Sequence, residues 1–288
     1  MRRATLVRMG RIRLGFKLAG ASWRIVRKEK SLLAFPVLSA AFGIGYGLLV
    51  MLPLGLIGFV AFGENTILGW VLLAIGLFGM NIGASFFGVA AAANASQVLD
   101  GKDPTLGTGI GVAWSRKGVI VQWGLLAATV GLVLQLLSDR AGGIGGALIQ
   151  MIGGAAWSIA SFFVLPILAL EGIGPIAALK KSLSVVRARW GESIVGGATV
   201  TLIPALVALV GVGIAVLGFV AGSGSSWAAG VPLVVVGVII LIGAITVGAV
   251  LRAVFTVVVY RYATEGVAAE GFPADELDQV FHAKKQRG

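Results

Sequence analysis

The sequence predicts an all-α polytopic integral membrane protein with six transmembrane helices. Of its 288 residues, 58% are hydrophobic and only 12% are charged, whereas soluble domains carry about 25% charged residues. Several apolar runs exceed the roughly 18 residues that mark a membrane-spanning helix. A transmembrane β-barrel would need many short segments of alternating polar and apolar residues, and the sequence does not alternate in this way. Helices that cross a bilayer are therefore the expected structure.

The first 30 residues form a separate basic segment. They contain ten Lys and Arg residues against one acid, Glu29, and their apolar residues recur at helical spacing. This pattern predicts an amphipathic helix on anionic headgroups, with a disordered basic tail as the alternative for residues 1–10. A signal peptide is disfavoured because the apolar run after Lys30 is too long for one. The side chains predicted to face lipid or a partner are Arg11, Arg13, Lys17 and Arg24.

Six apolar runs follow and make up a predicted membrane domain over residues 31–264. Their expected bounds are about 32–62, 67–98, 118–137, 144–170, 194–221 and 228–260. Several exceed the roughly 20 residues that a bilayer requires, so tilt, kinks or extension into the interface must absorb the excess. Prolines in or near these runs free backbone groups that neighbouring helices are expected to satisfy: Pro36, Pro53, Pro166, Pro204 and Pro232.

The distribution of Lys and Arg predicts the orientation in the membrane. With the N-terminus placed in the cytoplasm, only Arg140 of the 23 Lys and Arg residues lies on the opposite side. Such a bias predicts that both termini are cytoplasmic. The net charge is +11, and because the cations lie next to the spans, anionic lipid is a closer partner than nucleic acid.

A cytoplasmic surface helix is predicted after the fourth run. That run ends at Glu171, a Gly-Ile-Gly-Pro turn follows, and Pro175 suits the first helical position, where no N–H is needed. The apolar stripe of this helix consists of Ile176, Leu179, Leu183, Val186 and Trp190. Its basic residues, predicted to face lipid or a partner, are Lys180, Lys181, Arg187 and Arg189.

Glu171, Arg252 and Asn81 are the polar residues predicted to lie in the membrane or at its edge. Counted from the outer ends of their runs, Glu171 lies roughly 40 Å along its helix and Arg252 roughly 36 Å, so both approach the cytoplasmic interface. One hypothesis makes Glu171 a counter-charge for Arg252 or for a basic residue of the 180–189 helix. The other makes Glu171 a proton or cation site.

Asn81 lies near the middle of the second run, with Ser85 one turn later. Polar groups in a membrane commonly form hydrogen bonds between helices, and Gln122 and Gln135 of the third run are the expected partners. The alternative is that they line a path for a solute. Pairs of glycines four residues apart also suggest helix contacts, although some arise by chance among 44 glycines: Gly43/Gly47, Gly79/Gly83, Gly142/Gly146 and Gly218/Gly222.

Motifs for catalysis, cofactor binding or metal binding are absent from the sequence. There is no Cys, the sole histidine is His282 in the polar C-terminal tail (residues 265–288), and no HExxH motif or Ser-His-Asp set is present. The glycine-rich stretch 107–111 lacks the Lys-Ser/Thr pair and the preceding strand of a nucleotide-binding loop. We therefore expect no enzyme activity, no cofactor and no metal.

Two sets of short motifs resemble a family of bacterial six-span membrane proteins of the DUF6159 type. The first set is Trp-Arg-Ile-Val-Arg-Lys at 23–28 with Leu-Leu-Ala-Phe-Pro-Val-Leu-Ser at 32–39. The second is made up of residues 163–166, 170–172, 178–182 and 190–192. A looser resemblance extends to the membrane domains of some glycerophosphodiester phosphodiesterases. The family resemblance implies six spans and a cytoplasmic signature loop, and it implies no particular activity.

These features predict a non-enzymatic protein of the bacterial cytoplasmic membrane. The leading expectation is a scaffold or partner-binding subunit whose basic cytoplasmic face contacts anionic lipids and a second protein or a second copy of the chain. The alternative is a small transporter or channel with a path near Asn81 and Glu171. A further alternative, suggested by the phosphodiesterase resemblance, is a lipid-handling accessory protein.

Overall fold

The computed structural model describes residues 29, 31–62, 67–190, 195–224 and 227–266. All regular secondary structure in these ranges is helical, and six helices are long and apolar enough to cross a membrane. The predicted fold class is therefore confirmed. The amphipathic helix expected within residues 1–30 and most of the 265–288 tail lie outside the described residues.

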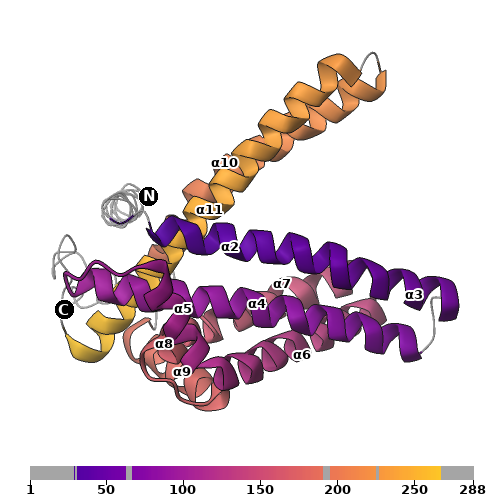
Figure 1. The fold of residues 1–288 in the computed structure, drawn as a ribbon. Coiled ribbons are helices and arrows are strands. Elements are labelled where there is room, and N and C mark those ends of the chain that lie inside the picture. The colour runs from indigo at the N-terminus through magenta and orange to yellow at the C-terminus, as the bar shows by residue number, and fades with distance from the viewer. Residues whose placement is uncertain (1–28, 30, 63–66, 191–194, 225–226, 267–288) are drawn as a thin grey trace, which may run out of the picture.

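The helices follow the predicted order of spans, with three additions: a π-helix and two short helices. Their bounds are α2 (Ser31–Tyr46), the π-helix η1 (Gly47–Met51), α3 (Leu52–Phe62), α4 (Ile67–Leu99), α5 (Leu106–Ser115), α6 (Lys117–Ala141), α7 (Gly143–Ala160), α8 (Val164–Leu170), α9 (Pro175–Trp190), α10 (Val195–Gly224) and α11 (Trp227–Glu265). Figure 1 shows α2 to α4, α6 and α7 running alongside one another as a bundle.

The central helix of the bundle is α4, which packs against α2, α3, α5, α6, α8 and α11. Its segment from Val89 to Ser96 is buried throughout, and most of these residues are alanine. Small side chains let several helices approach one axis closely. Larger side chains then fill the core around this segment, notably Phe35 of α2 and Phe255 of α11, both with 1% exposure or less.

The start of α2, the end of α4, the turn before α9 and the end of α11 meet at one end of the bundle, which we call the junction end. Ser31 Oγ donates a hydrogen bond to the Pro104 carbonyl over 3.3 Å. Arg261 Nη1 donates to Asp100 Oδ1 over 2.6 Å and so ties α11 to the end of α4. The predicted orientation makes this the cytoplasmic end, and because no membrane is present in the structure, that sidedness stays a prediction.

Two spans are irregular close to a proline, where the sequence led us to expect kinks. The π-helix η1 ends just before Pro53, which has no N–H for the carbonyl of Leu49 and whose ring crowds that carbonyl. The wider π turn relieves this conflict. In the fourth span, helical structure stops after Ala160 and resumes at Val164, two residues before Pro166.

The break before α8 is closed by a hydrogen bond from a neighbouring helix. The Phe163 N–H donates to Ser182 Oγ of α9 over 3.1 Å, and both residues are fully buried. A neighbouring helix thus satisfies a backbone N–H at the break in this span.

We predict that Ser182→Ala destabilises the protein by about 1–3 kcal/mol, because it removes the buried oxygen that accepts a hydrogen bond from the Phe163 N–H. The thermal unfolding of the purified chain in detergent measures the effect. Ser184→Ala is the matched control, because Ser184 is exposed and bonds only to a carbonyl of its own helix. Equal stability of the two variants would contradict the prediction.

The helix α9 begins at Pro175 as predicted, and part of its predicted apolar stripe contacts the protein, since Val186 is buried and Leu179 packs against the core. The predicted stripe included Ile176, which is 63% exposed. The buried face also contains Ala178, Ser182 and Val185, which lie outside the predicted stripe. The sequence pattern did not include Ser182 because serine is polar, and in the structure its buried hydroxyl oxygen accepts a hydrogen bond from the Phe163 N–H. The expected amphipathic contact of α9 with a membrane surface is not tested by this packing.

The last two helices form a hairpin that leaves the bundle at an angle (Figure 1). Only the end of α11 near the junction end packs against α2, α4, α8 and α9, and α10 packs against α11. Backbone contacts between glycines hold the hairpin together: a Cβ at Gly237 would lie 2.5 Å from the Ala215 amide nitrogen, and one at Gly218 would lie 2.6 Å from that of Val234. The Gly218/Gly222 pair is thus a true helix contact.

The other predicted glycine pairs behave differently from one another. Gly79 and Gly83 accommodate the stacked rings of Tyr46 and Phe42 from α2, which a Cβ would overlap. Added Cβ atoms at Gly47 and Gly142 would meet no atom within 4 Å, so the expectation of a close contact is wrong there. Spacing alone could not separate these cases, because it does not say which helix lies opposite.

Candidate functional site

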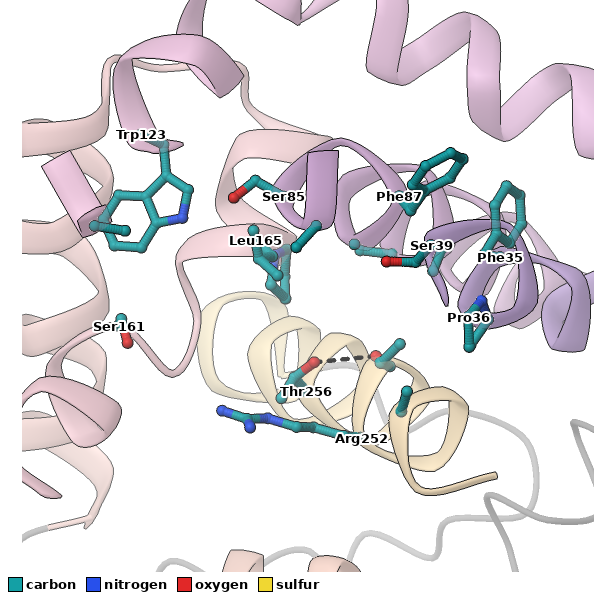
Figure 2. A pocket seen from close by; sticks show the side chains of 18 of the residues that line it. Phe35, Pro36, Ser39, Ser85, Phe87, Trp123, Ser161, Leu165, Arg252 and Thr256 are labelled. Carbon is teal, nitrogen blue, oxygen red and sulfur yellow. Dashed lines mark hydrogen bonds between the residues drawn. The ribbon is translucent and has the colours of Figure 1, made fainter. Parts of the chain in front are cut away.

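A cavity of about 360 Å³ lies where α2, α4, α6, α8 and α11 meet the break after α7. Its wall on α4 runs from Asn81 to Ala92, which is roughly 16 Å of helix. Most of the lining is apolar, including Phe35, Phe87 and Leu165 (Figure 2). The cavity is open at its edge, because Ala84, Ala249 and Arg252 line it and are exposed.

Six polar side chains line the cavity: Ser39, Asn81, Ser85, Ser161, Arg252 and Thr256. Ser161 Oγ donates to the Trp157 carbonyl over 2.7 Å, and Thr256 Oγ1 donates to the Ala253 carbonyl over 3.0 Å. Both hydroxyl protons are used in these bonds, so the two side chains can act only as hydrogen-bond acceptors toward a molecule in the cavity.

Asn81 lines the cavity and bonds within its own helix. Its Nδ2 donates to the Leu77 carbonyl over 3.0 Å. Asn81 therefore does not form the predicted hydrogen bonds to Gln122 and Gln135. Gln135 instead accepts a hydrogen bond from Gln150 of α7 and donates one to Asp139. Gln122 is exposed. Depth in the membrane suggested the pairing, but depth does not determine which side chains of two neighbouring helices meet.

Arg252 extends from α11 toward the segment that carries Ser161 (Figure 2). Its guanidinium lies over the ring of Phe162, 5.9 Å from the centroid, in a cation–π contact. The predicted ion pair with Glu171 does not form. Arg252 lies eight residues before Tyr260, or about 12 Å outward along the helix, and Glu171 is at the level of Tyr260.

Glu171 pairs with Lys181 of α9, the other partner that the sequence allowed. Lys181 Nζ lies 2.7 Å from both carboxylate oxygens, and the Tyr260 hydroxyl donates to Oε1. Lys181 also lies 6.0 Å from the centroid of the Tyr260 ring. The three side chains join α8, α9 and α11 at the junction end. Glu171 does not line the cavity, so Asn81 and Glu171 do not share it.

We predict that exchanging the two charges of this pair preserves most of its contribution to stability. Glu171→Lys and Lys181→Glu alone should each destabilise the protein by about 1 kcal/mol, because the pair is partly exposed and each single change brings like charges together. The double variant should unfold at nearly the wild-type temperature in detergent. A double variant no more stable than either single one would show that pairing is not the role of Glu171.

Glycine is required at position 172, directly after Glu171, for two reasons. Its φ of +63° is unfavourable for other residues, and a Cβ would overlap the guanidinium of Arg116, which lies between α5 and α6. In the described part of the chain, Arg116 Nε is buried without a hydrogen-bond partner. Glu171 therefore holds α9 through its charge, and Gly172 leaves the space that the Arg116 side chain occupies.

The glycine-rich stretch 107–111 has a structural role in α5. Asn94, fully buried, donates from Nδ2 to the Thr105 carbonyl over 2.9 Å and accepts from Thr108 Oγ1 over 3.2 Å. Gly109 packs against the same asparagine, Phe35 and the Ala90 carbonyl. These contacts hold α5 against α4. The packing explains the glycine at position 109, and a bound nucleotide is not needed to explain it.

The predicted basic residues are only partly placed. Lys180 and Arg187 are exposed on α9, whereas Lys181 is engaged by Glu171. Arg11, Arg13, Lys17 and Arg24 lie outside the described residues, and so does the side chain of Arg189.

Sequence reasoning missed the cavity, Tyr260 and the Trp123–Trp157 stack beside the cavity, whose ring centroids are 5.5 Å apart. Tyr260 stands directly before Arg261 at the end of the sixth apolar run, a place where aromatic residues commonly anchor. That position was the available signal for it.

Comparison with known proteins supports the architecture and leaves the activity open. Residues 71–271, well over half of the chain, match the model of a family described as a family of unknown function, DUF6159. No curated protein shows significant similarity to the chain. The looser similarity to phosphodiesterase membrane domains is therefore not shown. With six helices able to cross a membrane and this match over the region that contains the cavity and the Glu171 cluster, the chain belongs to the DUF6159 family.

Proposed function

We propose that this multi-pass membrane protein is a non-enzymatic lipid-handling protein, which takes an amphiphile from the bilayer into the cavity between α4 and α11. The observation that carries the proposal is the composition of the cavity wall, where Asn81, Arg252 and several hydroxyls lie among apolar side chains. Amphiphile sites need both kinds of surface. The wall on α4 extends roughly 16 Å, about half the hydrocarbon thickness of a bilayer.

We predict that filling the cavity with a large side chain removes a co-purifying amphiphile. Ala84→Trp and Ala249→Trp introduce an indole from two sides, at positions that are exposed and so have room for it. Native mass spectrometry of the full chain, purified in dodecyl maltoside, measures the bound amphiphile per molecule, and we expect a loss of most of it.

Ala155→Trp is the matched control, because Ala155 is exposed on α7 and does not line the cavity. The control should retain wild-type occupancy. Equal occupancy in the cavity variants and the control, or no bound amphiphile in the wild type after reconstitution in native lipid, would overturn the proposal.

A scaffold role remains a second candidate because of the α10–α11 hairpin. Beyond the junction end both faces of the hairpin are apolar, and Leu217, Phe219 and Ile239 are each at least 60% exposed. The partner proposed for this surface is a second copy of the chain. Since the chain has no Cys, a single Leu217→Cys should form a disulfide-linked dimer in membranes if this is correct. Ile152→Cys on α7, equally exposed, serves as the control.

The expected contact of the basic junction end with anionic headgroups is also part of this proposal. It is supported by the exposure of Lys180 and Arg187 on α9. The predicted location in a bacterial cytoplasmic membrane rests on the Lys and Arg distribution and on the sequence resemblance. A transport path that uses both Asn81 and Glu171 is not proposed, because only Asn81 lines the cavity.

A further inference from the structure

We infer that the ligand of the cavity is an anionic amphiphile whose phosphate or carboxylate group binds the guanidinium of Arg252. This inference rests on the proposed function, since it assigns a chemical class to the occupant of the same cavity. It starts from the position of Arg252 in the fold. Arg252 lies about 12 Å from the junction end, within an apolar span and at the edge of a cavity.

A cation at this depth needs an anion. Charged side chains inside a membrane are unfavourable by several kcal/mol unless they pair or reach water, and a guanidinium binds carboxylate or phosphate oxygens through two parallel hydrogen bonds. The acidic residues in the described ranges are Glu29, Asp100, Asp103, Asp139, Glu171 and Glu265. None of these six lines the cavity.

The acids nearest in the fold are already engaged elsewhere. Glu171 is held by Lys181, and Asp100 and Glu265 are held by Arg261. Arg252 forms no ion pair with any of them. The protein thus supplies a positive group to the cavity without supplying its counter-charge among the described residues.

The surroundings of Arg252 favour an amphiphile over a small free anion. The ring of Phe162 lies against the guanidinium, 5.9 Å from its central carbon to the ring centroid. The same cavity is lined by Leu165 of α8 and by α4 from Asn81 to Ala92, including Phe87, a mostly apolar surface that suits an apolar chain. An inorganic anion would leave this apolar part of the cavity empty.

Binding of three defined probes to the full chain in dodecyl maltoside tests the inference. Dodecyl phosphate carries both features, inorganic phosphate carries only the anion, and dodecanol carries only the apolar chain. The rise of the thermal unfolding temperature with probe concentration yields each dissociation constant. We expect saturable binding of dodecyl phosphate, with binding at least about tenfold weaker for the other two.

Two variants assign the effect to Arg252. Arg252→Gln should weaken dodecyl phosphate binding at least about tenfold, which is the scale of one lost charge-assisted hydrogen bond, and Arg252→Lys should lie in between. Arg140→Gln, at an exposed residue outside the cavity, controls for loss of net charge. Each variant must first show wild-type elution and a cooperative unfolding transition. Because Arg252→Gln removes a charge from an apolar span, it should fold at least as well as the wild type.

The outcomes separate this inference from the proposed function. If dodecyl phosphate and dodecanol bind equally, or if Arg252→Gln binds dodecyl phosphate as the wild type does, the anion inference is wrong while the cavity can still bind amphiphiles. Tight binding of inorganic phosphate alone would assign the site to a free anion and overturn the inference. If no amphiphile binds and the tryptophan variants also change nothing, the proposed function itself fails.

Discussion

Replacing Gly237 by leucine should separate α10 from α11 and should be among the most destabilising single changes in the chain. A Cβ at this position would lie 2.5 Å from the Ala215 nitrogen and 2.6 Å from the Gly211 carbonyl oxygen. These are backbone atoms of the opposite helix, which no side-chain rotation can move. Overpacking of this kind costs about 3 kcal/mol, or more where two backbones must part.

Two measurements check this result. The thermal unfolding temperature of Gly237→Leu in detergent should fall well below that of the wild type. Spin labels at Val212 and Val238, both exposed and on different helices of the hairpin, should show a longer and broader distance distribution in the variant. These labels require introduced cysteines, and the chain has none of its own to interfere.

Gly243→Leu on the same helix is the matched control. A Cβ at Gly243 would meet no atom within 4 Å, and leucine is a better helix former than glycine. This variant should therefore match or exceed wild-type stability, with an unchanged label distance. If both leucine variants behave alike, close glycine packing does not hold the hairpin.

Replacing Gly109 by alanine should destabilise the protein, although alanine normally stabilises a helix relative to glycine. The Cβ would lie 2.6 Å from the Phe35 ring, 2.7 Å from Asn94 Oδ1 and 2.8 Å from the Ala90 carbonyl oxygen. Relief requires α5 to move off α4, and that movement breaks the bonds of the buried Asn94 to Thr105 and Thr108. We expect a net loss of about 2 kcal/mol.

Gly111→Ala in the same helix should have the opposite sign. Gly111 is exposed and has open space where its Cβ would lie, so alanine should stabilise by about 0.5–1 kcal/mol. Thermal unfolding of the two variants in parallel gives the comparison. A stabilising Gly109→Ala would mean that α5 is not docked through this glycine.

Hydrophobicity predicted the spans of this protein because length and composition alone determine whether a helix can cross a bilayer. Each of the six predicted runs overlaps one of the six candidate spans, and the end of the fourth run falls at Leu170 as predicted, whereas the fifth span begins nine residues later than the predicted 194. Proline and glycine placed the start of α9, because both residues restrict the backbone locally, whereas the break before α8 was not predicted. The charges near Glu171 and its depth in the membrane limited its predicted partner to Arg252 or a basic residue of the 180–189 helix.

The remaining features depend on which helix faces which. In a membrane nearly every surface is apolar, so a periodic pattern cannot distinguish a lipid-facing side from a buried one. For this reason the sequence did not indicate that α9 contacts the bundle through Ser182, nor that Gly237 touches α10. The sequence also did not indicate that Asn81 and Arg252 line one cavity.

The sequence by itself determined that this chain is a helical membrane protein with six apolar segments long enough to cross a bilayer. Those properties follow from the transfer of each segment into lipid, which depends only on local composition. Only the tertiary structure decided that Lys181 and Tyr260 hold Glu171 and that Arg252 borders a cavity without a described counter-charge. Side-chain partners arise from the rotation and crossing of helices, and packing across the whole bundle sets both.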